Sequence, residues 1–381
     1  MFSFWERQSF VNYQYAVIGG GLVGISTALS IKELHPASSV AVFERGIIPY
    51  GASTRNAGFA CFGSMSELLS DINTMGVTKT RQLVEDRWAG LQLLRKRVGD
   101  SNLEYYNYGG YELLFAKDLH LLDKLESINE LLKPIFNCQV FTVKNQSIEQ
   151  FGFNQDRVAS LVWNPFEGQI DPGAMMKSLI GLARHRGIDY LTGARVKTLD
   201  REHNSVSFTV CTENEAEVKF QCRRLAVCTN AFTNSLLPEL EIKPGRGTVL
   251  VTAPIKGLKF KGVFHYDEGY FYFRNVGSRV IFGGGRNLDL KGEETFDLGF
   301  SEQIVQHLKN ELFDLVLPNQ HFEIEQQWSG IMAFGAEDKR PLVGLHCPEI
   351  GYAVRLGGMG IALGSLVGHQ LARLICFSEN C

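Results

Sequence analysis

The feature that most constrains this chain is a cluster of glycines between an apolar run and a helical pattern. The apolar run is Tyr15–Ile18, and Gly19-Gly20-Gly21-Leu22-Val23-Gly24 follows it directly. Apolar residues then recur with helical spacing from Leu22 to Leu34, and a second apolar run, Val40–Phe43, ends at Glu44. Strand, glycine turn, helix and strand in this order predict the opening βαβ unit of a dinucleotide-binding fold.

The glycine spacing has a physical reason at each position. Gly19 permits a tight turn, Gly21 lets backbone N–H groups approach a pyrophosphate, and Gly24 lets helix and strand pack closely. The phosphates would then lie at the positive end of the helix dipole. Glu44 stands 20 residues past Gly24, where an acid is expected to bind ribose hydroxyl groups. The alternative is an ordinary glycine turn followed by a surface glutamate.

Length and composition predict a two-domain globular protein. The chain has 381 residues, of which 45% are apolar and 21% charged. Its 38 Lys and Arg stand against 41 Asp and Glu, and there is no long basic run, so a nucleic-acid groove is not expected. The eight cysteines form no Cys-x-x-Cys and no ligand spacing with histidine, which predicts reduced thiols and no metal site.

The sequence also predicts a cytoplasmic protein without a membrane segment, and it leaves the oligomeric state open. The N-terminal stretch Met1–Gln14 carries Glu6 and Arg7 and has no apolar core of a signal peptide. The most apolar tract, residues 357–377, is interrupted by His369 and Arg373. We therefore expect a buried amphipathic helix there instead of a membrane span.

The rest of the sequence predicts a helical insertion, an antiparallel meander and a second, antiparallel sheet. A mostly helical stretch runs from about Glu67 to Leu132, and a later helix, Gly173–Arg186, opens at Asp171-Pro172. The meander and the buried strand after it cover Ala194–Leu199, Ser205–Cys211, Glu217–Cys222 and Leu225–Cys228. The second sheet covers Gly247–Ala253, Gly269–Arg274 and Arg279–Gly283, with a further strand at Phe322–Ser329. The other expected helices are Thr80–Val98, Asp118–Leu132 and Ser301–Phe313, with a short strand at Tyr111–Phe115.

Two further glycine-rich segments are candidates for ligand contact. Gly51-Ala52-Ser53-Thr54-Arg55-Asn56-Ala57-Gly58 follows the second strand, where small and hydroxyl side chains could line a phosphate cleft. Arg355-Leu356-Gly357-Gly358-Met359-Gly360 precedes the last helix, where a helix N-terminus could touch a flat ligand. The alternatives are an ordinary Ser/Gly loop and a glycine turn chosen for packing.

Together these three segments resemble the D-amino-acid oxidase family of flavoproteins, which includes glycine oxidase, sarcosine oxidase and γ-glutamylputrescine oxidase. The resemblance covers nearly the whole chain. Val17-Ile18-Gly19-Gly20-Gly21 with Glu44-Arg45 is similar to its FAD motif, and Gly51–Gly58 to its second flavin segment. The segments 168–172, 228–232, 244–247, 328–331 and 338–344 are also similar to family segments. Besides the first glycine turn and Glu44, the resemblance implies cofactor contacts from Arg45, Ser53, Thr54, Asn56, Ala57, Gly58, Val196, Thr229, Asn230, Ala231, Gly330, Gly357, Gly358, Met359, Gly360 and Ile361.

The chain departs from the family pattern at two places. After Gly330, where relatives often carry a carboxylate-binding arginine, it has Ile331-Met332-Ala333-Phe334. The sarcosine oxidase branch has a flavin-linked cysteine in that same stretch, so the resemblance implies non-covalent FAD here. That branch also has a lysine beside the flavin for oxygen activation, and a rough alignment places Ile281 there. The electron acceptor is therefore left open between oxygen and another compound.

Candidate substrate contacts lie on the strand that contains Tyr272 and Arg274. These two side chains alternate with Phe271 and Phe273, so one face of the strand could present Tyr and Arg to a substrate. Arg274 is the stronger catalytic candidate, because a cation on such a strand needs a partner. Cys61 and His265 are further candidates, but a buried structural thiol and a locally hydrogen-bonded histidine explain them adequately.

The fold expected from these observations is an α/β, Rossmann-like FAD-binding domain capped by an antiparallel substrate domain. We assign residues 1–80, 150–235 and 330–381 to the first domain, and 81–149 and 236–329 to the second. The expected activity is oxidation of a C–N bond of a primary or secondary amine, or of an amino acid derivative, to an imine. Two alternatives stay open: an NAD-dependent dehydrogenase and a non-catalytic flavoprotein subunit. The expected partner is a small-molecule amine.

Overall fold

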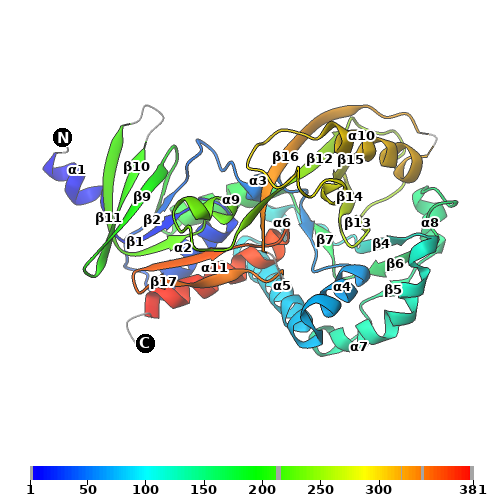
Figure 1. Cartoon of the computed structure of the whole chain (residues 1–381), viewed down its shortest axis with the longest axis horizontal. Helices are drawn as coiled ribbons and strands as arrows, with labels where there is room; N and C mark the ends of the chain where they lie inside the picture. Colours follow the sequence, from blue (N-terminus) through cyan, green and yellow to red (C-terminus); the bar gives the residue numbers. More distant parts are fainter. Residues whose placement is uncertain (1–2, 212–215, 319, 336–338, 378–381) are drawn as a thin grey trace.

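Two eight-stranded sheets lie side by side along the longest axis of the chain in its computed structural model (Figure 1). The structure describes residues 3–211, 216–318, 320–335 and 339–377. A small third sheet joins β3 (Phe59–Ala60) to β7 (Gly168–Gln169) between the two large ones. The helices are α1 Phe4–Ser9, α2 Leu22–Leu34, α3 Ala52–Arg55, α4 Met65–Met75, α5 Val77–Val98, α6 Asp100–Leu103, α7 Leu125–Phe136, α8 Gln146–Phe151, α9 Pro172–His185, α10 Glu302–Glu311 and α11 Gly360–Phe377.

The first sheet contains the predicted βαβ unit. Its main strand order is β17-β18-β11-β1-β2-β8, and β9 and β10 extend it through β11. β1 and β2 are parallel neighbours, with Tyr15 opposite Val40, and α2 connects them as the glycine pattern predicts. The bounds are β1 Asn12–Ile18, β2 Val40–Phe43, β8 Ile188–Leu191, β9 Arg195–Glu202, β10 Ser205–Cys211, β11 Glu217–Val227, β17 Leu342–Cys347 and β18 Ile350–Val354.

β11 joins two strands that the sequence predicts separately. Its first half pairs with β10 and completes the predicted antiparallel meander, whereas its second half pairs in parallel with β1 and β18. Arg223 and Arg224 lie between the two apolar halves and interrupt the alternation, but the backbone stays extended through them. A break in the sequence pattern here is therefore not a break in the strand.

The second sheet buries one face in an aromatic core. Its strand order is β16-β12-β15-β14-β13-β4-β6-β5. Phe264, Phe273 and Phe282 belong to the core cluster that α10 covers, while the alternate residues His265 and Tyr272 point to the opposite side. β13 and β4 run parallel, which corrects the prediction of a wholly antiparallel sheet. The bounds are β4 Gly110–Leu114, β5 Thr142–Val143, β6 Ser160–Asn164, β12 Lys243–Thr252, β13 Val263–Tyr266, β14 Phe271–Val276, β15 Arg279–Gly284 and β16 Ile324–Phe334.

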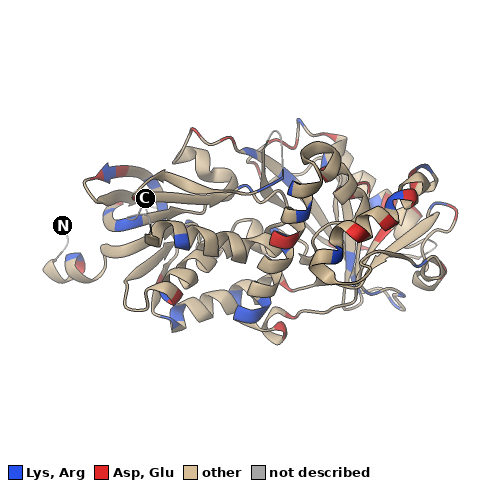
Figure 2. Cartoon of the chain, turned by 90° about the horizontal axis from the view of Figure 1, so that it is seen from below, with Lys and Arg blue, Asp and Glu red and all other residues tan. Residues whose placement is uncertain are grey.

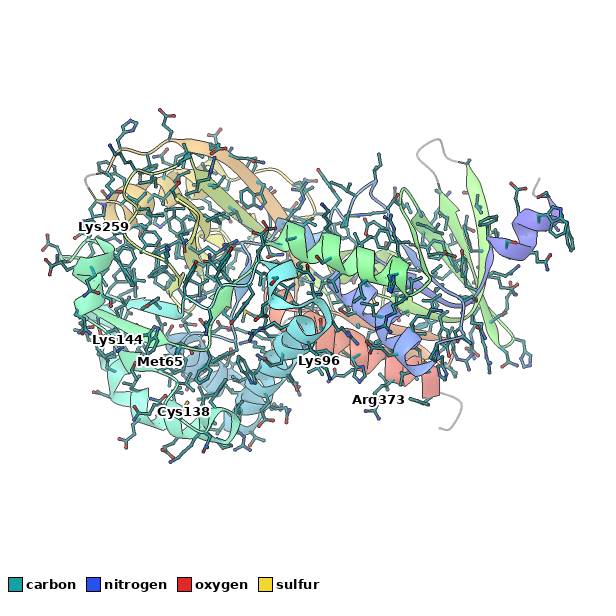
Figure 3. The ribbon with its side chains drawn as sticks, turned by 180° about the vertical axis from the view of Figure 1, so that it is seen from behind. Met65, Lys96, Cys138, Lys144, Lys259 and Arg373 are labelled. Carbon is teal, nitrogen blue, oxygen red and sulfur yellow. The ribbon has the colours of Figure 1, made fainter. Side chains whose placement is uncertain are left out.

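The last helix packs against the first sheet's own helix. α11 contacts α2 and α5, and side chains of all three helices share one core cluster. By length and composition α11 is the one helix among the described residues that could cross a membrane, and 56% of that stretch is buried in the fold. Figure 3 shows Arg373 of α11 along the lower side of the first sheet's half, and Lys259 and Lys144 on the second sheet's side.

The predicted helical insertion is broken more often than expected. In place of one helix at Asp118–Leu132, a tight 3-10 segment, Ala116–Lys124, precedes α7. Gly76, with φ of 83°, separates α4 from α5, because only glycine adopts that backbone shape cheaply. The predicted domain ranges stay a prediction. Two elements lie elsewhere than those ranges imply. β6, within the range 150–235 of the first domain, pairs with β4 in the second sheet, and α5, mostly within the range 81–149 of the second, packs on α11.

Charged side chains are distributed over both parts of the molecule. Figure 2 shows Lys and Arg interspersed with Asp and Glu along the helices and loops. The formal net charge of −3 is small for a chain of this length.

Candidate active site

The glycine turn brings two predicted ligand segments together at the N-terminus of α2. Gly19 has φ of 103°, and a Cβ on it would collide with the carbonyl oxygen of Cys228 at the end of β11. Gly24 packs so closely on Gly19 that no side chain fits between them. The N–H of Leu22, in the first turn of α2, donates to Ser53 Oγ at 2.9 Å. Ser53 therefore lies where the helix dipole and free N–H groups favour a phosphate.

Glu44 is buried at the end of β2 and its carboxylate faces the turn. Oε2 accepts the N–H of Gly20 at 3.0 Å, and Oε1 accepts the N–H of Gly46 at 2.9 Å. Two carboxylate oxygens offer about four acceptor positions, so room remains for ribose hydroxyl donors. Beside it, Arg45 stacks on the Phe232 ring, with 3.8 Å from the guanidinium carbon to the ring centroid.

The second flavin segment is held as a rigid loop by Asn56. Its Nδ2 donates to the carbonyls of Ala52 and Ser53, and its Oδ1 accepts the N–H of Gly58 at 2.8 Å. Thr54 Oγ1 donates to the carbonyl of Pro49 at 2.8 Å. Asn56 and Thr54 thus shape the segment internally, while Ser53 reaches the helix.

The other end of that segment is fastened to the second sheet. Trp328 Nε1 donates to the carbonyl of Arg55 at 2.9 Å, and Arg55 Nη1 donates to the carbonyl of Ser329 at 2.8 Å. Gly330 lies against Arg55, where a Cβ would approach the Arg55 side chain to 3.1 Å. Gly330 accordingly serves close packing between β16 and the segment.

The third glycine segment meets the first through residues at the end of β11. Asn230, with φ of 48°, accepts the N–H of Arg355 on its Oδ1 at 3.1 Å. Gly357 and Gly358 both have positive φ and lead into α11, whose first turn contains buried Ile361. Met332 Sδ lies 3.5 Å from the position of a Cβ on Gly358. These contacts bring the N-terminus of α11 beside β16.

The remaining predicted cofactor residues lie beside the contacts that connect the N-terminus of α2 with the N-terminus of α11. The N–H of Ala194 donates to the carbonyl of Glu44 at 2.9 Å, which places Val196 close to the end of β2. Thr229 Oγ1 is hydrogen-bonded to Thr233, and Ala231 is buried in a cluster with Ile331. Met359 and Gly360 form the turn into α11. Asp338, at the start of the predicted segment 338–344, lies outside the described residues.

These residues fit an extended FAD. The path runs from the N-terminus of α2, with Glu44 beside it, past Ser53 and the loop to Gly58, and reaches the N-terminus of α11. The N-terminus of α2 suits the phosphates, and the N-terminus of α11 suits the electron-rich edge of the flavin.

The chain was compared with known proteins. A model of the DAO family, described as FAD dependent oxidoreductase, matches residues 14–374. The chain belongs to the DAO family of FAD-dependent oxidoreductases. It is 21% identical over 415 aligned positions to D-amino acid dehydrogenase of Helicobacter pylori (strain J99), covering 95% of this chain and 94% of that protein.

Solved structures share the fold of this FAD-dependent oxidoreductase. L-proline dehydrogenase from P. horikoshii superposes with a TM-score of 0.76 at 19% identity, covering 96% of this chain and 93% of that one. Glycine oxidase from Geobacillus kaustophilus gives 0.74 at 20% identity, covering 96% and 95%. The match confirms the predicted Rossmann-like FAD domain with a capping domain. The family model decides against the NAD-dependent and non-catalytic alternatives.

Arg274 of this oxidoreductase lies at the predicted place but is engaged differently than expected. All its guanidinium nitrogens donate to main-chain carbonyls: Nε to Ala57, Nη2 to Ile170 at 3.1 Å and Nη1 to Asn275 at 3.3 Å. Burial lowers the pKa of Arg274 to about 10. These contacts hold the flavin segment against the second sheet, and the catalytic role of Arg274 stays a prediction.

Tyr272 forms an aromatic wall with Phe59, which the sequence analysis did not single out. The two rings lie 5.3 Å apart, edge to face, and Phe59 contacts the His265 ring in the same way at 5.2 Å. Tyr272 also lies against Gly283 and close to Gly247, whose missing side chains leave room for it. Burial raises the pKa of Tyr272 to about 12, so its hydroxyl stays protonated near neutral pH. The position of Phe59, directly after Gly58, is the signal that could have found it.

A buried group of charged side chains lies beyond the aromatic wall of Phe59 and Tyr272. No residue spacing in the sequence predicts this group. Glu67 on α4 pairs with Arg87 on α5 at 3.2 Å and with Lys339 at 3.5 Å, and Lys339 also pairs with Asp71 at 2.8 Å. Burial raises the pKa of Asp71, whereas Lys339 and Arg87 outweigh burial at Glu67 and leave the pKa of Glu67 below its usual value. These partners come from helices and a loop far apart in the chain.

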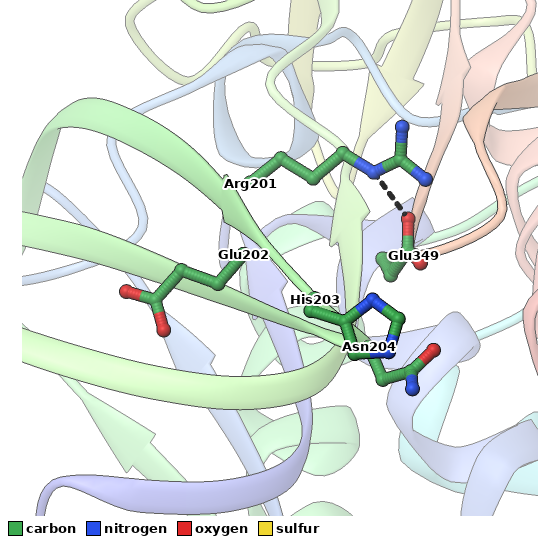
Figure 4. Close-up of a pocket in the computed structure, with 5 residues that line it drawn as sticks. All are labelled: Arg201, Glu202, His203, Asn204 and Glu349. Carbon is green, nitrogen blue, oxygen red and sulfur yellow. Dashed lines mark hydrogen bonds and ion pairs between the residues drawn. The ribbon is translucent and has the colours of Figure 1, made fainter.

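A surface hollow elsewhere carries no part of this site. It lies at the β9–β10 hairpin and is lined by Arg201, Glu202, His203, Asn204 and Glu349 (Figure 4). Arg201 Nε donates to Glu349 Oε2 at 2.8 Å, and both belong to the outer end of the first sheet. The hollow faces solvent, far along the sheet from the helix N-termini that suit FAD.

Proposed function

We propose that this oxidoreductase oxidises the C–N bond of a primary or secondary amine, or of an amino acid derivative, to an imine, which water then hydrolyses. Relatives named for oxidation or dehydrogenation of D-amino acids, glycine and L-proline support C–N oxidation as the shared chemistry. Bound FAD supplies the hydride acceptor. The substrate we propose carries no carboxylate next to the reacting carbon.

One observation carries the substrate part of the proposal: the guanidinium of Arg274 is taken up by three main-chain carbonyls. The stretch after Gly330 supplies Ile331 and Met332 in place of an arginine. A carboxylate buried beside the flavin without a bidentate cation would cost several kcal/mol. Phe59 and Tyr272 offer an apolar wall with one hydroxyl, which suits an uncharged amine carbon.

The chain's own residues would then mainly position the substrate. The aromatic wall holds the reacting carbon and excludes water, and Tyr272 offers one hydroxyl donor. The substrate reacts as the neutral amine, so no strong protein base is required. Arg274 acts at a distance by fixing the carbonyls of Ala57 and Ile170.

The decisive test is anaerobic reduction of the flavin by a panel of amines in rapid mixing. Glycine and sarcosine are compared with amines that lack an α-carboxylate, such as N-acylated diamines. We expect the latter to reduce the flavin at least about tenfold faster. Arg274→Lys and Arg274→Ala, with rates divided by flavin content, should slow all substrates to a similar degree. Fastest reduction by simple α-amino acids, slowed selectively in Arg274→Ala, would show that Arg274 binds a carboxylate.

We also propose that FAD is held non-covalently. Ile331–Phe334 contains no cysteine that could form a flavin linkage. Acid precipitation should therefore release the yellow colour into the supernatant. Colour that stays with the protein pellet after repeated washing would contradict this proposal.

A further inference from the structure

We propose that Cys61, Glu167 and His265 form a binding site for one divalent transition metal ion of the zinc type. The Cys61 sulfur, a Glu167 oxygen and a His265 ring nitrogen all lie within 4.8 Å of one another, and all three residues are buried. They come from three separate segments: Cys61 follows β3, Glu167 precedes β7, and His265 lies in β13. The site does not depend on the proposed amine substrate.

The ligand types and their spacing suit zinc. Thiolate, imidazole and carboxylate are its usual ligands, at about 2.0 to 2.3 Å, and a tetrahedral ion with three protein ligands keeps a fourth position open. Ligand atoms a few ångströms apart need only small side-chain shifts to close on such an ion. A sulfur with an imidazole disfavours Mg²⁺ and Ca²⁺, which take oxygen ligands.

Glu167 is already positioned as a one-oxygen ligand. Its Oε1 accepts the N–H groups of Phe62 and Gly63 at 3.2 and 3.4 Å. These bonds stabilise a buried carboxylate and leave Oε2 turned toward His265. The pairing of β3 with β7 keeps Cys61 and Glu167 on adjacent strand ends.

His265 supplies an independent observation that points to a ligand. The residue is buried, with 6% of its surface exposed, yet its Nε2 makes no hydrogen bond of normal geometry to any described residue. Its ion-pair contact, Glu167 Oε2, lies at 3.4 Å. A buried ring nitrogen held only by so long a contact is poorly satisfied, which is rare and costly. A metal ion between Nε2, Oε2 and the Cys61 sulfur would satisfy it.

A buried thiol alone does not explain this arrangement. Cys222 is buried to a similar degree in β11, but it packs in an apolar cluster and takes part in no such group of ligand atoms among the described residues. Cys222→Ala is therefore a matched control for Cys61→Ala. His265→Asn removes the Nε2 ligand while keeping a polar side chain of smaller size.

The test measures zinc in the purified holoenzyme. The protein is treated with a chelator, titrated with Zn²⁺, passed through a gel-filtration column and analysed by inductively coupled plasma mass spectrometry. We expect about one ion per chain in wild type and in Cys222→Ala, and loss of at least about tenfold in Cys61→Ala and His265→Asn. Flavin content and a cooperative thermal transition in each variant confirm folding.

X-ray absorption at the zinc edge gives a second readout that needs no variant. One sulfur at about 2.3 Å with nitrogen or oxygen neighbours at about 2.0 to 2.2 Å is expected. Absence of bound zinc in wild type, equal zinc in all variants, or a zinc shell without sulfur would each overturn the proposal. None of these results would alter the flavin-reduction test of the proposed function.

Discussion

Gly21 shows how little space one residue has at the start of α2. A Cβ there would lie 2.7 Å from Ser53 Oγ, at the place where the helix N-terminus should meet phosphate. We expect Gly21→Val to abolish FAD binding, measured as the ratio of flavin to protein absorbance after gel filtration. Gly181→Ala in α9 is the control, because nothing lies within 4 Å of its added Cβ and it lies outside the ligand segments. Full flavin occupancy in Gly21→Val would show that the turn is misinterpreted.

For single residues, the sequence predicted which side chains lie near the site, but not which atoms each one contacts. Alternation along β14 correctly placed Tyr272 and Arg274 on one face. It could not reveal that Arg274 bonds to Ala57 and Ile170, because these partners lie 217 and 104 residues away in the chain. For the same reason His265 looked isolated, although Glu167 lies beside it in space.

Among the elements, the contact between α5 and α11 depends on one glycine. A Cβ on Gly90 would collide with the carbonyl oxygen of Ala362, which is backbone and cannot swing away. We expect Gly90→Ala to destabilise the protein by about 1–3 kcal/mol despite the better helix propensity of alanine. Thermal unfolding measures this as a lowered Tm.

Gly181→Ala supplies the control for that experiment. Gly181 lies on the exposed side of α9 with nothing within 4 Å of an added Cβ. The substitution should stabilise by up to about 1 kcal/mol. A Gly90→Ala variant as stable as Gly181→Ala would mean that α5 and α11 are packed more loosely than in the structure.

Helices and strands with a clear periodicity of apolar residues were predictable from the sequence. Features that depend on pairing with residues far away in the chain were not. α2, β2 and α11 follow directly from glycine turns and apolar spacing. The parallel pairing of β13 with β4 joins residues more than a hundred positions apart, which alternation does not report. The break between the 3-10 segment Ala116–Lys124 and α7 likewise has no glycine or proline to mark it.

Across the whole molecule, the buried Arg87–Glu67 pair links α5 to α4 and, through Lys339, to the chain after β16. We expect Arg87→Met to destabilise by about 3–5 kcal/mol, because it leaves a buried carboxylate with one cation fewer. Arg87→Met with Glu67→Met should recover part of that loss. Chemical denaturation at neutral pH measures both variants, and a fully additive double variant would contradict a direct coupling.

The same pair predicts a direction of pH dependence. Although burial alone would raise it, the pKa of Glu67 lies below its ordinary value because of Lys339 and Arg87. A depressed carboxylate pKa stabilises the fold above the ordinary value, about 4.3, and that stabilisation is lost as pH falls through the folded pKa. Wild type should therefore lose more stability than Glu67→Gln between pH values of about 6 and 3. Equal losses in both proteins would contradict the assigned pairing.

For the molecule as a whole, fold class and cofactor were predictable because three short segments must converge on one ligand. The domain ranges were harder to predict, since the chain passes between the two sheets several times. β6 lies in the second sheet beside β5, whereas α9, which follows it in the chain, packs on α2 and β8 of the first. Chain position alone does not tell which sheet such a short strand joins.

The late position of β18 and α11 along the chain has a consequence for biosynthesis. β18 pairs with β11, and α11 covers α2 and α5, so the FAD-binding half closes only after residue 377 has left the ribosome. Until then a nascent chain exposes the apolar flanks of α2 and α5 to water or to a chaperone. The turn that binds the cofactor is thus translated well before the strand and the helix that complete its surroundings.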